Sequence, residues 1–157
     1  MIARLAMVVA VLLAVPALGS NYFLDQIVSV ASRSEIRRLK RAGVRTTDEL
    51  ARRGATPQGR TELHRRTGIS LSRLSYLSSL ADLMRLRGIG PDAARVLVAA
   101  GCRSVAELQQ ADPYALAEVI QRVNDRARLS TNPPRAENLQ AWIAQARQMV
   151  PLYTPDS

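Results

Sequence analysis

The stretch of residues 83–101 constrains the fold of this chain more than any other. Two glycines, Gly88 and Gly90, flank the apolar Ile89 between two segments with helical patterns. Glycine adopts positive φ without a steric penalty, so the pair predicts a turn too tight for most residues. Pro91 follows at a first helical position, where its fixed φ suits the helix and its missing N–H costs nothing. The sequence therefore predicts two helices joined by a glycine hairpin.

Helical signals continue along the rest of the chain. Apolar residues return every three or four positions, capping residues precede most segments, and no segment shows the sustained alternation of a strand. The sequence therefore predicts an all-α fold. The expected helices run from Ser32 to Gly43, from Thr46 to about Arg53, from Thr56 to about Thr67, from Leu71 to Leu86, from Pro91 to Gly101 and onward from Asp112, with a last helix that carries Leu139, Trp142, Ile143 and Ala146.

Sliding the chain along itself by 58 positions reveals an internal repeat. Residues 39–46 then lie over residues 97–104, and in both copies a helix ends on Ala-Gly, one arginine follows and a capped helix begins. The match fails upstream, where residues 30–32 occupy the place of the glycine hairpin. Two such units can bury a shared core that neither could bury alone, and we expect only the second to keep the glycine hairpin.

The second copy resembles the helix-hairpin-helix motif. Leu86, the run Gly88-Ile89-Gly90, Ala94 and Leu97 occupy the usual positions of that motif. The resemblance implies that backbone amides at the hairpin hold a nucleic-acid phosphate. Free N–H groups and the positive end of a helix dipole favour an anion, so this function is physically reasonable.

The whole layout is similar to an uncharacterised bacterial family, the domain of unknown function 4332, whose members pair a degenerate and a complete helix-hairpin-helix. The strings at residues 55–60 and 81–90 carry this resemblance, which covers about residues 28–149. It implies a compact tandem helix-hairpin-helix domain at residues 20–150. We expect a first, degenerate unit at about residues 28–70, a second at about 71–149, and a flexible tail at 151–157.

The charge of the chain is one-sided. The net charge is +9, and residues 20–90 hold 14 Lys+Arg against 6 Asp+Glu, whereas residues 91–157 hold 7 of each. A basic half is typical of an electrostatic footprint for phosphate, although an ordinary solvated Arg-rich surface or a GC-rich genome would also produce it. The basic residues predicted to face outward on the first helix are Arg33, Arg37, Arg38, Lys40 and Arg41.

Three arginines lie close to the predicted hairpin in the sequence. Arg85 and Arg87 precede it, with side chains expected near the surface, and Arg95 lies one turn inside the following helix. All three could flank an anion held at the Gly90 amide, although glycines at a corner are also demanded by the fold alone. The candidate nucleic-acid-binding residues are therefore Gly88, Ile89, Gly90, Arg85, Arg87 and Arg95.

The sequence offers little for catalysis or for a metal. Its only histidine is His64 and its only cysteine is Cys102, so neither an intramolecular disulfide nor a Cys/His metal cluster can form. Cys102 is interpreted as a small buried residue. No triad, Walker-type loop or paired-carboxylate signature is present. We therefore expect no enzymatic activity, no metal and no cofactor.

The first 19 residues are typical of a secretory signal peptide. Arg4 precedes an apolar run at residues 5–15, and Ala17 and Gly19 are the small residues of a cleavage site. The run is short for a membrane span. We expect cleavage after Gly19, a mature chain that does not span the membrane, and a periplasmic or secreted location. The alternative is an uncleaved anchor helix that continues through residues 22–24.

Two functions remain open at this point. The first is an exported module that binds double-stranded DNA without sequence preference, which the glycine hairpin and the basic half favour. The second is an envelope domain for protein–protein interaction without nucleic acid. The degenerate first copy favours it, as does an expected lack of exposed aromatic residues, because Trp142 is interpreted as a core residue.

Export can be tested directly on the native protein. We expect a mature N-terminus at Ser20 and a soluble product, because the apolar run and the small residues before Ser20 suit cleavage there. Mass spectrometry of the protein isolated from its host measures this. An intact Met1 in the membrane fraction would instead establish a single-helix anchor.

Overall fold

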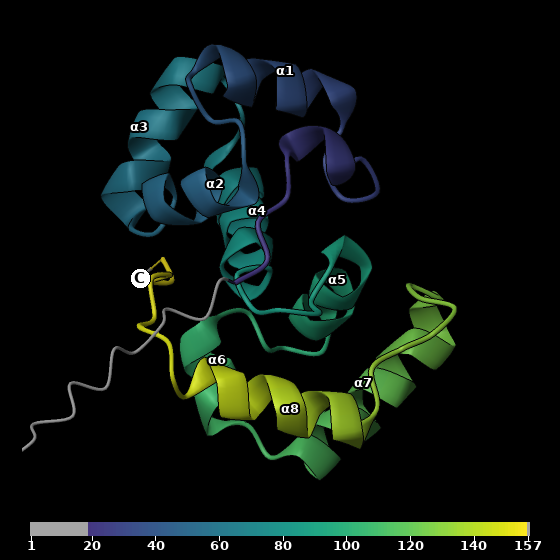
Figure 1. Cartoon of the computed structure of the whole chain (residues 1–157). Helices are drawn as coiled ribbons and strands as arrows, with labels where there is room; N and C mark the ends of the chain where they lie inside the picture. The colour runs from purple at the N-terminus through teal and green to yellow at the C-terminus, as the bar shows by residue number, and fades with distance from the viewer. Residues whose placement is uncertain (1–18, 157) are drawn as a thin grey trace, which may run out of the picture.

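The computed structural model describes residues 19–156, so the segment expected to be a signal peptide lies outside this range except for Gly19. Within this range the chain folds into eight α-helices and one short 3-10 helix, with no β-strand (Figure 1). The prediction of an all-α fold is confirmed. The elements are η1 (Leu24–Gln26), α1 (Arg33–Arg41), α2 (Thr47–Arg53), α3 (Pro57–Thr67), α4 (Leu71–Leu83), α5 (Pro91–Ala99), α6 (Val105–Gln110), α7 (Pro113–Ala127) and α8 (Ala136–Ala146).

The internal repeat is visible in the backbone. Both bounds of α1 and α5 differ by the 58 positions of the sequence repeat, and so do the starts of α2 and α6. A glycine with positive φ follows each first helix, Gly43 at 83° and Gly101 at 89°. Glu49 and its counterpart Glu107 then each accept a hydrogen bond from the backbone amide four residues earlier. The two copies therefore share one local structure over these two helices.

Helix α4 is the element that joins the two copies. It contacts α2 and α3 on one side and α5 on the other, and Figure 1 shows it at the centre of the molecule. Leu74, Leu77, Leu80 and Leu83 of this helix are fully or almost fully buried. A unit boundary near residue 70 therefore assigns to the second copy a helix that packs against both.

The end of α4 differs from the prediction. The helix stops at Leu83 rather than at Leu86. Beyond it, Arg85 N donates to the Asp82 carbonyl at 3.3 Å and Leu86 N donates to the Leu83 carbonyl at 3.1 Å, so the chain tightens into successive turns. Leu86 remains fully buried, which explains why its spacing matches the helical pattern.

An ion pair fastens α1 to α4. Arg73 donates to the Glu35 carboxylate at 2.6 Å and to the Val30 carbonyl at 2.5 Å. Glu35 also accepts a hydrogen bond from Ser32 N at 2.7 Å, which closes the predicted capping box of α1. The hydrogen bond from Arg73 outweighs partial burial and lowers the pKa of Glu35 to about 2. This carboxylate is therefore charged at neutral pH.

Arg60 is almost completely buried, with 1% of its surface exposed. Its guanidinium donates to the Gly54 carbonyl at 2.8 Å, beside the start of α3. It also donates to the Thr154 carbonyl and to the Asp156 carboxylate, both at 2.7 Å. The ring of Tyr153 stacks over the same guanidinium at 4.9 Å. A buried guanidinium needs such partners, and here the C-terminal segment supplies most of them.

Residues 150–156, the C-terminal strap, therefore bind back onto the first copy. Figure 1 shows this segment leaving α8 and ending near α2 and α3. Thr154 N adds a hydrogen bond to the Ala55 carbonyl at 2.7 Å. Hydrogen bonds from Ser75 and Arg60 hold the pKa of Asp156 below its ordinary value. The sequence predicts a flexible tail here because the partner, Arg60, lies more than 90 residues away.

Replacing Asp156 with alanine tests the strap. We expect a loss of roughly 1–3 kcal/mol in the free energy of unfolding, because buried donors of Arg60 lose their acceptor. Denaturant unfolding measures it. The matched control is Glu118→Ala, which breaks the exposed 3.8 Å pair with Arg122 and should change stability by less than about 0.5 kcal/mol. Equal effects of the two substitutions would show that the strap is not held as described.

Candidate nucleic-acid interface

The glycine turn, residues 84–90, connects α4 to α5 and contains most of the predicted site. Leu86 and Ile89 of the turn are fully buried, and Ile89 N donates to the Leu86 carbonyl at 3.2 Å. Gly88, by contrast, is exposed. The two apolar side chains fix the turn in the core, so the turn presents backbone rather than apolar side chains to solvent.

Only one of the two glycines has a left-handed conformation. Gly88 has a φ of 91°, whereas Gly90 has a φ of −89°, which other residues adopt freely. A Cβ at Gly88 would also come within 3.1 Å of Trp142 Nε1, whereas the nearest atom at Gly90 would be the Tyr22 hydroxyl at 3.8 Å. The expectation that both glycines serve a tight turn is therefore corrected. The steric demand falls on Gly88 alone.

The N-terminus of α5 is open. Its N-cap residue, Gly90, has no side chain to accept a hydrogen bond, and none of the described residues accepts one from the amides of Gly90, Asp92 or Ala93. Free amides at the positive end of a helix favour water or an anion. Six other helices have a side-chain cap, at Ser32, Thr46, Thr56, Ser70, Ser104 and Asp112.

Helix α8 packs against the glycine turn. Gln145 Oε1 accepts a hydrogen bond from Arg87 N at 2.6 Å, and Gln145 Nε2 donates to the Arg87 carbonyl at 3.4 Å. Trp142 packs beside Gly88 with 9% of its surface exposed, which confirms its interpretation as a core residue. The amide of Arg87 is already engaged, whereas the amides of Gly88 and of the start of α5 have no acceptor among the described residues.

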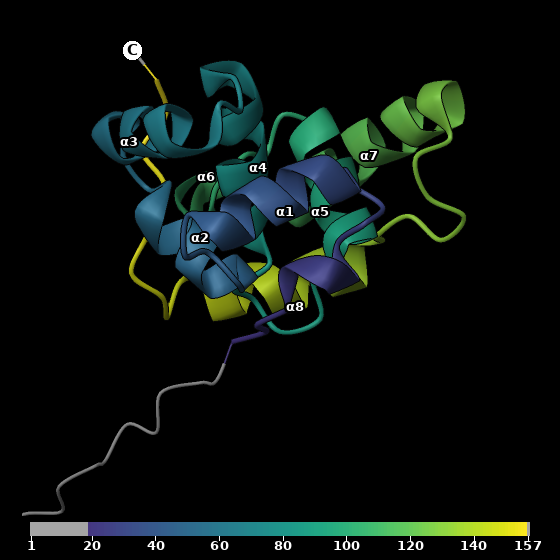
Figure 2. The same ribbon diagram turned by 90° about the horizontal axis from the view of Figure 1, so that it is seen from above.

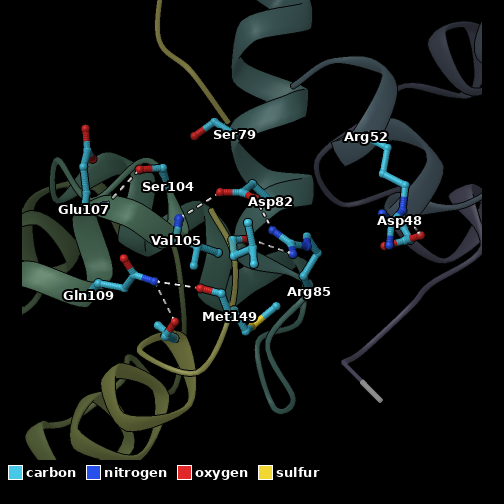
Figure 3. Close-up of polar contacts among 12 residues, drawn as sticks. Asp48, Arg52, Ser79, Asp82, Arg85, Ser104, Val105, Glu107, Gln109 and Met149 are labelled. Carbon is cyan, nitrogen blue, oxygen red and sulfur yellow. Dashed lines mark hydrogen bonds and ion pairs between the residues drawn. The ribbon is translucent and has the colours of Figure 1, made fainter. Parts of the chain in front are cut away.

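Arg85 lies inward rather than at the surface. It pairs at 2.8 Å with Asp82, which is fully buried, and only 12% of the Arg85 side chain is exposed (Figure 3). Its guanidinium also donates to the Val150 carbonyl at 3.1 Å. The second oxygen of Asp82 accepts a hydrogen bond from Val105 N at 2.8 Å. The expectation that Arg85 lies near the surface with a free charge is therefore corrected, because its guanidinium is engaged by a buried carboxylate.

The other two predicted arginines differ in their surroundings. Arg95 is partly buried, pairs with Asp92 at 3.4 Å and donates to the Leu129 carbonyl. Arg87 is exposed, and no described carboxylate pairs with it. Of the three, Arg87 alone combines a position on the glycine turn with a free charge.

A second basic surface lies on α1. Arg33, Arg37 and Arg41 follow one another at four-residue spacing, are exposed, and form no ion pair with any described carboxylate. Arg45 continues this surface just beyond the helix. We call these four residues the α1 arginine stripe. The four-residue spacing of these arginines is visible in the sequence, but the candidate site predicted from the sequence does not include them.

Two aromatic side chains are strongly exposed. Phe23 precedes η1 with 64% of its surface exposed, and Tyr114 lies at the start of α7 with 63% exposed. The expected lack of exposed aromatics is therefore wrong. The run Tyr22-Phe23-Leu24 is apolar as a whole and could continue an anchor helix, so the sequence does not mark Phe23 as an exposed ring.

Cys102 and His64 both lie in locally defined surroundings. Cys102 is buried, and this burial raises the pKa of its thiol to about 12, so the thiol stays protonated at neutral pH. His64 Nδ1 lies 2.7 Å from the Ile69 carbonyl at the end of its own helix. Over residues 19–156, no three His, Cys, Asp or Glu side chains converge as metal ligands would. No helix in that range has the length and apolar character to cross a membrane.

The fold defines a small all-α domain with two repeated two-helix segments and a glycine turn in the second copy. One family model, described as Domain of unknown function (DUF4332), matches residues 30–149. The chain therefore belongs to this family. The match includes both copies and ends where the C-terminal strap begins. No curated protein and no solved structure matches the chain.

Gly88 and Gly90 form a matched pair for testing the turn. We expect Gly88→Ala to cost roughly 1–3 kcal/mol of stability, because alanine is strained at positive φ and its Cβ would press on Trp142. Gly90→Ala should cost less than about 1 kcal/mol, since its backbone conformation is ordinary. Thermal unfolding of both variants measures the difference. Equal losses would contradict the assignment of the left-handed position to Gly88.

Proposed function

We propose that this protein binds the phosphate backbone of double-stranded DNA without reading its sequence. The single observation that carries the proposal is the α1 arginine stripe, which remains exposed and unneutralised in the folded chain. Clustered cations of this kind attract a polyanion and release its counterions on binding. Contacts to phosphate position a protein but carry no sequence information, so we infer binding without a preferred site.

Comparison of the two copies indicates that the fold does not require the α1 arginine stripe. Pro91, Arg95 and Ala99 of α5 occupy the positions of the three α1 arginines, and Arg95 is paired with Asp92. Helix α5 thus has the same backbone as α1 without a free arginine at these three positions. A genome-wide bias toward arginine would act on both halves, yet residues 91–157 hold equal numbers of basic and acidic residues.

The glycine turn supplies a second contact in this proposal. A phosphate at the start of α5 would accept hydrogen bonds from the free amides of Gly90 and Asp92, with Arg87 beside it. Arg85 has a structural role in the proposal, because it neutralises Asp82. Residues 19–22 pass next to this turn, since a Cβ at Gly19 would collide with the Arg85 carbonyl and Tyr22 lies near Gly90. The proposal retains export, which would place the protein outside the cytoplasm.

A protein–protein interaction domain of the cell envelope is the second candidate. The contacts of Gln145 and Trp142 with the glycine turn favour it, because α8 already covers part of the surface that would meet DNA. In that case the open end of α5 would be satisfied by water. The two candidates differ in their dependence on salt and on the α1 arginine stripe.

Fluorescence anisotropy with two short duplexes of unrelated sequence tests the proposal. We expect equal affinity for both and a steep loss between about 50 mM and about 200 mM salt. The triple variant Arg33→Gln, Arg37→Gln, Arg41→Gln should weaken binding to both duplexes and flatten the log–log salt slope by about one unit per lost contact. All three changes lie on exposed side chains, so the fold should persist.

The matched control removes the same charge from the second copy. The triple variant Arg122→Gln, Arg126→Gln, Arg135→Gln also changes exposed arginines, and it should retain the affinity and salt slope of the wild type. Arg87→Gln, made alone because Arg85 pairs with a buried carboxylate, should flatten the slope by about one unit. No binding by wild type at low salt, or equal losses in both triple variants, would overturn the proposal.

A further inference from the structure

Two shallow hollows lie side by side on the basic face of the first copy. One, of about 430 Å³, is lined by Phe23 with Arg41 and Arg45. The other, of about 320 Å³, is lined by Val28 with Arg33 and Arg37. The ion pair between Lys40 and Asp25 borders both hollows. Each hollow thus combines one exposed apolar side chain with two arginines that no described carboxylate neutralises.

Phe23 is held in place by its backbone rather than by its side chain. Its amide donates to Gln26 Oε1 at 2.8 Å, and its carbonyl accepts from Gln26 N at 2.9 Å. A bridge to Thr46 and a hydrogen bond from Leu24 N to the Arg45 carbonyl at 2.9 Å fasten this segment to the loop before α2. The ring therefore stays exposed on a fixed support, although exposure of so large an apolar surface brings no gain in folding.

The chemistry of the larger hollow matches one nucleotide. An aromatic face stacks on a nucleobase, and guanidinium groups pair with phosphate, and this combination is what holds single strands on proteins. A base inside a duplex is stacked on its neighbours and cannot reach the ring. A single strand exposes its bases and can.

We propose that Phe23, Arg41 and Arg45 form a binding site for an unpaired nucleotide, with its base against Phe23 and its phosphate between the arginines. This site deepens the proposed function and rests on it, because it adds recognition of single-stranded segments to general binding of phosphate. Arg33 and Arg37 continue the basic track along α1 toward the second hollow. The ligand class is therefore a single-stranded nucleic acid.

The form of the surface favours a nucleotide over an anionic membrane. A membrane-binding surface needs apolar side chains that enter the lipid together, with basic residues around them. Here the Lys40–Asp25 pair separates Phe23 from Val28, so a charged ridge would have to enter the lipid with them. Separate hollows suit separate small planar groups.

Anisotropy with a labelled oligothymidine and with a duplex of equal length tests this site in the full chain. Phe23→Ala should lower affinity for the single strand by about 5- to 100-fold, the range expected for the loss of one stacked base, and leave duplex affinity unchanged. Tyr114→Ala removes an equally exposed ring from α7 and should change neither affinity. Phe23→Trp should retain binding, and its indole fluorescence should be quenched when the oligonucleotide is added.

The outcomes separate this site from the proposed function. If wild type binds neither nucleic acid, both fail together. If wild type binds both but Phe23→Ala binds oligothymidine as tightly, the nucleotide site is wrong and the general DNA-binding function stands. If wild type ignores oligothymidine but sediments with vesicles of phosphatidylglycerol and phosphatidylcholine in a Phe23-dependent way, the surface binds lipid and the inference is overturned. Melting temperatures of both Phe23 variants should equal that of wild type.

Discussion

The buried carboxylate of Asp82 is the interaction on which the second half of the molecule depends. Asp82 lies in the last turn of α4 with no solvent exposure, and a carboxylate in that position needs both a countercharge and hydrogen-bond donors. Arg85 supplies the charge from the glycine turn, and the amide of Val105 supplies a donor from the start of α6 (Figure 3). Arg85 then donates to the Val150 carbonyl, where the C-terminal strap begins. One carboxylate thus fixes the glycine turn, α6 and the strap relative to α4.

The first copy meets the same requirement with a different part of the chain. Thr47 is the counterpart of Val105, and its amide donates to the Tyr22 carbonyl at 2.8 Å instead of to an aspartate. Tyr22 N returns a hydrogen bond to the Thr47 hydroxyl at 3.0 Å. Residues 22–24 therefore occupy the place that the end of α4 takes in the second copy. Figure 2 shows η1 and the chain that leads into it at the same edge of the molecule as the glycine turn. This pairing is also what leaves the ring of Phe23 at the surface.

Local rules predicted the parts of the fold that local interactions determine. The side chains of Ser32, Thr46, Thr56, Ser70 and Asp112 cap the helices that their sequence context indicates, and the repeat appears at its predicted offset. Prediction failed where a side chain finds its partner far along the chain. The burial of Arg60 depends on residues 154 and 156, and the covering of the glycine turn depends on residues 142 and 145. The partner of Arg85 lies only three residues earlier, but nothing in the sequence marks Asp82 as buried, so the engaged state of Arg85 could not be predicted.

The two copies differ in where they offer groups that can bind an anion, and this difference limits the size of a ligand that could use both. In the first copy Ser32 and Glu35 close the start of α1, and the free charge lies along the helix. In the second copy the start of α5 is open, and its outer face carries no free arginine at the matching positions. A small anion could use one of these features but not both. A ligand that used both would have to extend from the glycine turn, past residues 19–23, to α1. That reach favours a polyanion over a single phosphate, and it makes the joint loss of binding in Arg87 and α1 variants more informative than either alone.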